Sequence, residues 1–283
     1  MKNLEYIEIN KAEEGSRSLS KAEHKTLRGA IGKLMWVCEQ TRPDLAYNCL
    51  ELSYKSRDAT VNDLRKANKA IKKAKDEISK VNYTRVGDFK DLKVITITDG
   101  SYLKLEEKTK SVMGRFVFLS GADGKIVNCI GWKGKTIPTV CKSPKASETR
   151  AAEKAVEDAI FVARTLCELY RGKRGEDQIP VIIYTDSQAL LDSMNSTRQI
   201  ENKLLRPIIK WFKQCLDSKM VKEVKWCDTE VCLADILTKS GSKLTEKALD
   251  LLRNNEMVDL TFSREKNKEK DMELLKRGDQ GTM

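Results

Sequence analysis

The stretch "VITITDGSYL" at residues 94–103 ends an apolar run with an aspartate, a glycine and a serine. Side chains alternate between the two faces of a strand, so Ile95, Ile97 and Asp99 are expected to share one face. Asp-Gly between apolar runs is also the strongest short signal for a hairpin turn. The stretch alone favours the turn, and Asp99 becomes a candidate metal ligand only if other carboxylates gather beside it.

The residues around this stretch predict a mixed α/β sheet. β-Branched and aromatic residues with turn signals between them mark strands at residues 91–98, 111–121, 125–134, 181–185 and 221–226. Helical patterns lie at residues 147–170, from 187, at 204–216 and around 233–241. Three antiparallel strands followed by strands that alternate with helices indicate a mixed five-stranded α/β sheet flanked by helices.

Changes in composition divide the chain into three segments. Residues 1–90 are predicted to be mainly helical, and Ser20 and Glu23 have the spacing of a capping box at the start of one helix. Residues 91–255 hold the predicted sheet and its helices. Residues 256–283 are rich in charge, and we expect a flexible tail there.

The chain is basic, with 53 Lys and Arg against 42 Asp and Glu in 283 residues, a formal charge of +11. Such an excess favours a polyanionic partner, and nucleic acid is the commonest one. Residues 61–75 alone carry six basic side chains against one acidic side chain. That segment fits either a solvated helix face or a surface that follows phosphates.

Cysteine, histidine and apolar usage exclude several classes of protein. The eight cysteines are scattered, and the nearest pair, Cys227 and Cys232, has no second pair or histidine to complete a zinc site. We therefore expect free thiols in a reducing compartment. With His24 as the one histidine, catalysis must use carboxylates, hydroxyls or lysines. No apolar stretch is long enough to span a bilayer and no secretory signal is found, so we expect an intracellular protein of the cytoplasm or nucleus without a membrane partner.

Three further carboxylates occupy unusual positions. Glu148 begins the apolar stripe of the long helix, where an unpaired ionisable group is costly, although a first-turn acid also complements the helix dipole. Asp186 follows the fourth strand, where ligands bind in α/β sheets, although it or Ser187 also fits as the cap of the next helix. Asp235 lies among apolar residues inside an expected helix, where aspartate is unfavourable.

Several tracts carry a family resemblance. They are "LRGAIGKLMWVCEQTRPDLAY" at 27–47, "MGRFVFLSG" at 113–121, "IGWKGKTIPTVCKSPKASE" at 130–148, "IYTDSQALL" at 183–191 and "LADILTKS" at 233–240. In this order they resemble the C-terminal part of the Pol polyprotein of copia-type retrotransposons, where the end of reverse transcriptase precedes ribonuclease H. The resemblance implies a ribonuclease H-like sheet preceded by a helical reverse-transcriptase tail, or connection segment, at residues 1–90.

Position by position, the resemblance implies that Asp99, Glu148, Asp186 and Asp235 are the catalytic carboxylates and metal ligands. The implied enzyme is a ribonuclease H, a metal-dependent endonuclease that hydrolyses the RNA strand of RNA·DNA hybrids. Its cofactor would be two Mg²⁺ ions, with Mn²⁺ as a substitute, because Mg²⁺ takes hard oxygen ligands. Asp99 would bridge both ions, Glu148 and Asp186 would hold one, and Asp235 would hold the other. We expect these carboxylates to meet at one point that no lysine or arginine fills, with Asp99 beside a turn.

Side chains near these acids are candidate nucleic-acid contacts: Ser101, Lys133, Lys135, Lys142, Lys145, Thr149, Ser187 and Gln188. The lysines form a basic run that leads into Glu148 and suits a phosphate backbone. The RNA strand would be distinguished by its 2′-hydroxyls. The implied partners are an RNA·DNA hybrid and an upstream reverse-transcriptase polymerase core. No two aspartates are adjacent in the sequence, so we expect no DNA synthesis by this chain.

Two other functions remain open from the sequence. One is a catalytically silent remnant that binds nucleic acid or acts as a scaffold. The other is an integrase-like transferase, a class that uses three acids and usually carries a zinc module, for which the sequence has no signature. Magnesium-dependent cleavage of a labelled hybrid separates the ribonuclease from the silent remnant.

Overall fold

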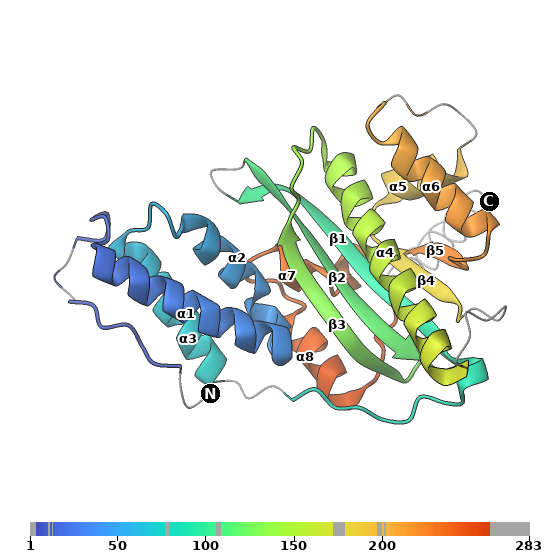
Figure 1. Ribbon diagram of the computed structural model, residues 1–283, viewed down its shortest axis with the longest axis horizontal. Helices are drawn as coiled ribbons and strands as arrows, with labels where there is room; N and C mark the ends of the chain where they lie inside the picture. The colour runs from blue at the N-terminus through green and yellow to red at the C-terminus, as the bar shows by residue number, and fades with distance from the viewer. Residues whose placement is uncertain are drawn as a thin grey trace, which may run out of the picture.

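The computed structural model describes residues 4–10, 12, 14–76, 80–105, 109–171, 179–196, 200 and 202–260. Its centre is a five-stranded sheet with the order β3-β2-β1-β4-β5 (Figure 1). The strands are β1 (Lys93–Leu105), β2 (Lys110–Ser120), β3 (Val127–Thr136), β4 (Val181–Thr185) and β5 (Glu223–Trp226). The first three are antiparallel, whereas β4 runs parallel to β1 and β5 runs parallel to β4. The predicted mixed sheet is confirmed.

One face of the sheet is covered by helices that connect its strands. They are α4 (Pro144–Arg171), α5 (Gln188–Asn195) and α6 (Arg206–Asp217). Val94 of β1 and Ile183 of β4 pack in one apolar cluster with Val156 of α4 and Phe212 of α6. The apolar residues of α4 recur every three or four positions, which turns one continuous stripe of the helix toward the strands.

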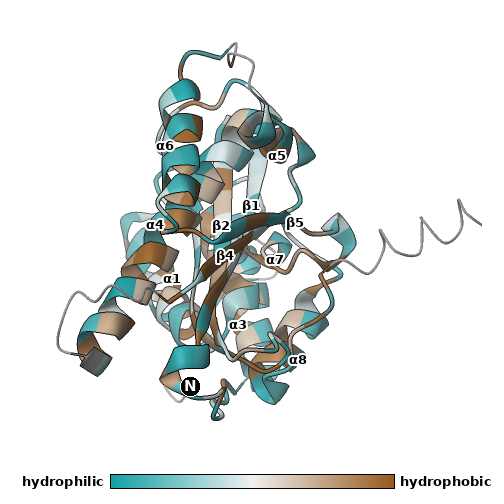
Figure 2. Ribbon diagram, turned by 90° about the vertical axis from the view of Figure 1, so that its right-hand side faces the viewer, coloured by the Kyte–Doolittle hydropathy of each residue, from teal (hydrophilic) through white to brown (hydrophobic). Residues whose placement is uncertain are grey.

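The other face of the sheet shares a hydrophobic cluster with helices from both ends of the described chain. They are α1 (Lys21–Gln40), α2 (Ala46–Lys55), α3 (Val61–Asp76), α7 (Asp235–Thr238) and α8 (Thr245–Asn254). Figure 2 views the sheet between its two layers, with α4 and α6 on one side and α7 and α8 on the other. Ile95 and Ile97 belong to the apolar cluster on this face, whereas Val94 belongs to the cluster on the opposite face. The predicted alternation of side chains along β1 is therefore confirmed.

The N-terminal helices share a hydrophobic core with the sheet. The indole Nε1 of Trp132 on β3 donates to the carbonyl of Cys38 at 2.9 Å, and one apolar cluster extends from Leu4 to Leu260. Residues 1–90 and residues 91–255 thus contribute to one hydrophobic cluster, and the division of the chain at residue 90 stays a prediction.

Two sequence expectations are wrong in detail. Asp99 and Gly100 lie inside β1, paired with Gly114 and Met113 of β2, so "DG" forms no tight turn and Asp99 is not beside one. Residues 256–260, assigned to the tail, are packed instead, because Met257 N–H donates to the Lys125 carbonyl at 2.8 Å. The rest of the predicted tail, residues 261–283, lies outside the described residues.

Within the described ranges, no helix has both the length and the apolar character needed to cross a membrane.

Candidate active site

Carboxylates from three separate elements converge beside β1. Asp99 lies on β1, Glu148 lies in the first turns of α4, and Asp186 follows β4. Each offers an oxygen, and these oxygens all lie within 4.8 Å of one another. Asp99 is 2% exposed, while the other two are half-buried. Three negative charges so close together repel each other strongly unless a proton or a cation intervenes.

Glu148 reaches β1 because the backbones of β1 and α4 touch. A Cβ at Gly100 would lie 2.5 Å from the carbonyl carbon of Ser147, so only glycine fits this approach. The Gly100 N–H donates to Glu148 Oε2 at 3.0 Å, and the Ser147 hydroxyl donates to the Gly100 carbonyl at 3.0 Å. Gly100 therefore lets α4 pack directly on β1, and its N–H holds the carboxylate of Glu148 in place.

Asp186 is placed by the parallel pairing of β1 and β4. Thr98 pairs with Thr185, so the next residue of each strand, Asp99 and Asp186, extends toward the same end of the sheet. Asp186 Oδ2 accepts a hydrogen bond from the Thr229 hydroxyl at 3.1 Å. Asp186 Oδ1 is buried and has no hydrogen-bond partner among the described residues, which is unusual for a carboxylate oxygen.

Asp235 is the first residue of the short helix α7. Asp235 became a candidate because the sequence pattern predicted it in the middle of a helix, and that position is wrong. Asp235 nevertheless lies beside Asp186 at the site. Gly114 has no side chain, so α7 can lie close over β2. A Cβ added at Gly114 would be only 2.8 Å from Leu237 Cβ. Asp235, Asp186 and Cys232 form a second group, whose ligand atoms lie within 4.8 Å of one another. This group shares Asp186 with the group of Asp99, Glu148 and Asp186.

Burial and repulsion between carboxylates raise the pKa values of Glu148, Asp186 and Asp235. Desolvation, followed by the charges of Asp99 and Asp186, raises the pKa of Glu148 to about 9. Desolvation, followed by Asp99 and Asp235, raises the pKa of Asp186 to about 6. The pKa of Asp235 is also raised, by desolvation and then by Asp99. A cation bound among these carboxylates would relieve their mutual repulsion and favour their ionised forms.

Sequence reasoning missed three side chains that contact the acids: Thr229, which donates to Asp186, and also Thr238 and Lys239. The Thr238 hydroxyl donates to Asp99 Oδ2. Lys239 Nζ lies 2.6 Å from Asp235 Oδ1 and 3.9 Å from Asp99 Oδ2. Burial lowers the pKa of Lys239, but the carboxylates of Asp99 and Asp235 outweigh burial and raise it. A centre made of carboxylates alone was expected from the sequence, so a lysine beside Asp235 departs from that expectation. The spacing of four residues between Asp235 and Lys239 could have indicated the pair.

The group of Asp99, Glu148 and Asp186 fits a hard divalent cation. Its donor atoms are carboxylate oxygens, which Mg²⁺ and Mn²⁺ prefer. The partnerless Asp186 Oδ1 is a buried acceptor that a cation would satisfy. Cys232 is a poorer ligand because its thiol faces the Thr98 carbonyl at 3.8 Å, and hydrogen bonding to Cys227 and burial raise its pKa well above the usual value.

The predicted hydroxyl and amide contacts are mostly engaged within the protein. Thr149 is fully buried and its hydroxyl donates to the Lys145 carbonyl at 2.7 Å. The Ser187 hydroxyl caps α5 by accepting from Leu190 N–H at 3.3 Å, which confirms the capping interpretation. Gln188 is exposed and donates to Asp192 at 2.8 Å. Ser101 is buried and its hydroxyl has no partner among the described residues.

The predicted lysine contacts lie on two elements and the segment between them. Lys133 and Lys135 are exposed on β3, which is an edge strand. Lys142 is exposed ahead of α4, and Lys145 is half-buried in its first turn. A contact of these lysines with nucleic acid stays a prediction.

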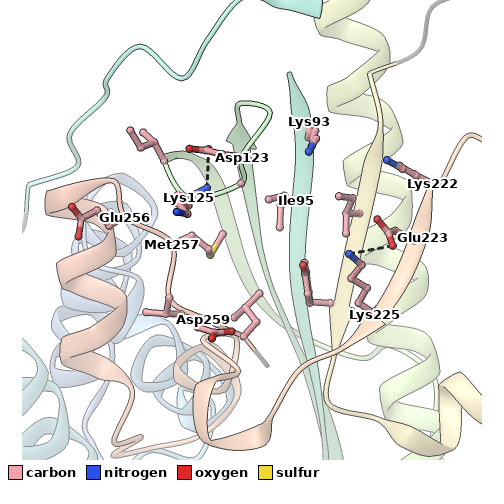
Figure 3. Close-up of a pocket in the computed structure, with 16 residues that line it drawn as sticks. Lys93, Ile95, Asp123, Lys125, Lys222, Glu223, Lys225, Glu256, Met257 and Asp259 are labelled. Atoms are coloured by element: carbon pink, nitrogen blue, oxygen red, sulfur yellow. Dashed lines mark hydrogen bonds and ion pairs between the residues drawn. The ribbon is translucent and has the colours of Figure 1, made fainter. Parts of the chain in front are cut away.

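A groove elsewhere on the molecule contains none of the predicted site residues. It is lined by residues of β1, β4 and β5, by the turn at residues 123–126 and by residues 256–260, and Figure 3 shows Lys93, Lys125, Lys222 and Lys225 around it. Asp99 lies in the middle of β1, and Asp186 follows the far end of β4, so both acids are away from this groove. Basic and acidic side chains alternate around the groove, so it has no strong charge preference.

No protein-family model and no curated protein matches the chain. Three solved structures that match are all ribonuclease H domains. The N-terminal RNase H domain of a Mycobacterium tuberculosis protein, fused to maltose-binding protein, is 16% identical, with a TM-score of 0.36 over 57% of this chain and 96% of that one. An RNase H1 isolated from compost, in complex with an RNA/DNA hybrid, is 17% identical, with a TM-score of 0.36 over 56% and 97%. RNase H1 from the archaeon Halobacterium salinarum is 16% identical, with a TM-score of 0.34 over 56% and 98%.

Proposed function

We propose that the protein is a divalent-metal-dependent endonuclease that hydrolyses the RNA strand of RNA·DNA hybrids, as a ribonuclease H from a copia-type Pol. The observation that carries the proposal is the convergence of Asp99, Glu148 and Asp186 within 4.8 Å, with Asp235 adjoining through Asp186. The tracts that led to the copia resemblance support the hybrid as substrate, as does the formal charge of +11.

Asp99, Glu148 and Asp186 would hold one Mg²⁺ ion, and Asp99 and Asp235 would share a second. When bound, such ions polarise water and neutralise charge on a transferring phosphoryl group. Thr238 holds Asp99 in place through its hydroxyl, and the Gly100 N–H holds Glu148. These bonds fix the carboxylates before any substrate arrives, which lowers the cost of organising the site during the reaction.

One observation favours a second candidate, a silent module that binds nucleic acid. The Lys239 ammonium at 2.6 Å already neutralises Asp235, so part of the charge that a cation would balance is balanced by the protein. A basic protein with such a site would still bind a hybrid through its lysines.

Cleavage of an RNA·DNA hybrid labelled on the RNA strand, with Mg²⁺, tests the proposal. The wild type should cut the hybrid and leave a DNA duplex of the same sequence intact. Asp186→Asn should abolish cutting, because it removes the negative charge of a ligand without changing its shape. Asp217→Asn, the same change at an exposed position at the end of α6, should cut like the wild type. Hybrid binding without cleavage in the wild type would establish the silent module instead.

A further inference from the structure

Lys239 holds a defined position at the acidic site. It immediately follows α7, and its N–H donates to the Asp235 carbonyl at 2.9 Å. Its ammonium lies 2.6 Å from Asp235 Oδ1, and its side chain is 35% exposed. A half-buried ammonium with two carboxylates in reach is held much more firmly than a lysine in a surface ion pair.

The backbone beneath Lys239 has little freedom to move. The helix α7 packs on β2 and β3 at two glycines, since a Cβ at Gly114 would lie 2.8 Å from Leu237 Cβ and one at Gly134 would lie 2.9 Å from the Leu237 carbonyl oxygen. Thr238 is fully buried. The spacing of four residues brings Lys239 to Asp235, and the packing of α7 holds this pair beside Asp99. The lysine can therefore leave only by a change in its side-chain conformation.

The acidic site is divided into two unequal sides. On the Asp235 side, Asp235 Oδ1 accepts from Lys239, and Asp99 Oδ2 accepts from Thr238. On the other side, Asp186 Oδ1 is buried without a partner among the described residues. The Asp235 side therefore has a cationic partner within the protein. The other side has only neutral donors, the Thr229 hydroxyl and the Gly100 N–H, and keeps one buried oxygen without a partner among the described residues.

Cys232 does not make up for the occupied oxygens on the Asp235 side. It is fully buried, and its sulfur lies 3.8 Å from the Thr98 carbonyl, where the S–H donates. A thiol that keeps its proton is a weak ligand, because metals bind the thiolate. A divalent ion on this side would have to share the Asp235 carboxylate with the Lys239 ammonium, which lies 2.6 Å from one of its two oxygens.

We propose that Lys239 is a built-in counter-ion, so that the protein without substrate binds one divalent ion, at Asp99, Glu148 and Asp186, and a second ion enters only by displacing the lysine. This inference rests on the proposed function and specifies its metal requirement. The ammonium supplies one positive charge at Asp235, whereas a divalent ion would supply two and would also coordinate water.

Titration of Mn²⁺ into the full chain without nucleic acid tests this, with calorimetry to count the ions and electron paramagnetic resonance to detect magnetic exchange between close pairs. The wild type should bind one ion without exchange. Lys239→Gln should bind two with an exchange signal, the second at least about tenfold tighter than any second ion in the wild type. Lys243→Gln removes the same charge from an exposed position four residues away and should behave like the wild type.

Two results would overturn the inference and leave the nuclease assignment intact. One is a wild type that already binds an exchange-coupled pair of ions. The other is a Lys239→Gln protein that still binds one ion, even if more tightly, because loss of a nearby positive charge strengthens any cation site. If neither protein binds Mn²⁺, the metal site of the proposed function fails together with the inference, and the hybrid cleavage assay decides the function separately.

Discussion

Gly100 of β1 lies against the backbone of Ser147 at the start of α4, so closely that a Cβ at position 100 would be 2.5 Å from the Ser147 carbonyl carbon. This contact sets the distance between the strand that carries Asp99 and the helix that carries Glu148. Because the obstacle is backbone, no rotation of a side chain relieves it. The acidic site depends on one position where no side chain is tolerated.

Gly100→Ala should therefore destabilise the protein by about 1–3 kcal/mol, the usual cost of overpacking a closely packed region. Gly29→Ala is the matched control. Nothing lies within 4 Å of a Cβ at Gly29, which is in α1, so alanine there should stabilise by about 0.5–1 kcal/mol. Urea denaturation followed by circular dichroism measures both, and equal midpoints for the two variants would contradict the close approach.

The metal-free protein should lose stability as the pH rises. The pKa values of Glu148 and Asp186 are raised to about 9 and about 6 by burial and mutual repulsion. An acid whose pKa is higher in the folded state stabilises the fold while it is protonated, and this contribution is lost as the pH rises from its unfolded pKa through its folded pKa. The thermal midpoint in EDTA should therefore fall between about pH 4 and pH 9.

Two comparisons isolate this effect from other titrating groups. Glu148→Gln should flatten the decline in thermal midpoint, because the amide has no charge to desolvate. Mg²⁺ should raise the wild-type midpoint more at pH 8.5 than at pH 5, since ionised carboxylates bind the cation. A Glu148→Gln protein with an unchanged pH slope would show that the buried glutamate is not the cause.

Thr238→Val should weaken the metal site without unfolding the protein. Valine matches the shape of threonine, but it removes the hydroxyl that donates to Asp99 Oδ2. Loss of a bond that orients a metal ligand typically costs about 10–100-fold in metal affinity or activity. Calorimetric titration with Mn²⁺ measures this loss. Thr238→Ser, which keeps the hydroxyl, should retain most of the affinity, and equal losses in the two variants would assign the effect to packing.

Arg42→Met should be strongly destabilising, because Arg42 joins the first helices. Its guanidinium pairs with Asp44 at 2.8 Å, both side chains are 0% exposed, and its Nη1 donates to the carbonyls of Lys73 and Ala74 in α3. Removing one member of a buried pair costs about 3–5 kcal/mol. Arg85→Met, which breaks the exposed pair with Asp88, should cost less than about 1 kcal/mol. Guanidinium denaturation distinguishes the two, and similar losses would mean that the buried pair contributes little.

The motif "TRPDLAY" thus has a structural explanation that its sequence did not reveal. As a sequence it served as a marker of family resemblance. In the structure, Arg42 and Asp44 are two residues apart and form a buried pair that ties the connection between α1 and α2 to the last turn of α3. Such a role depends on the distant carbonyls of Lys73 and Ala74, which no local pattern indicates.

The sequence predicted the strands and long helices well because their signals are local. The alternation of apolar residues along β1 and the apolar stripe of α4 each depend on near neighbours in the chain. The same local reasoning failed at "DG". Gly100 is needed because α4 packs against it, but in the sequence a glycine after an aspartate resembles a turn residue. Local reasoning also failed at Asp235, because the extent of α7 is set by its packing on β2 and β3.

The sequence by itself determined the order of strands and helices, the basic surface and the short set of acids from which a site could be built. The family resemblance led us to expect that Asp99, Glu148 and Asp186 meet, and the tertiary structure brings their oxygens within 4.8 Å of one another. The tertiary structure alone decided that Lys239 joins them at Asp235. The physical reason is range: hydrophobic periodicity acts over a few residues, whereas repulsion and pairing among charges depend on distances that only the packed backbone fixes.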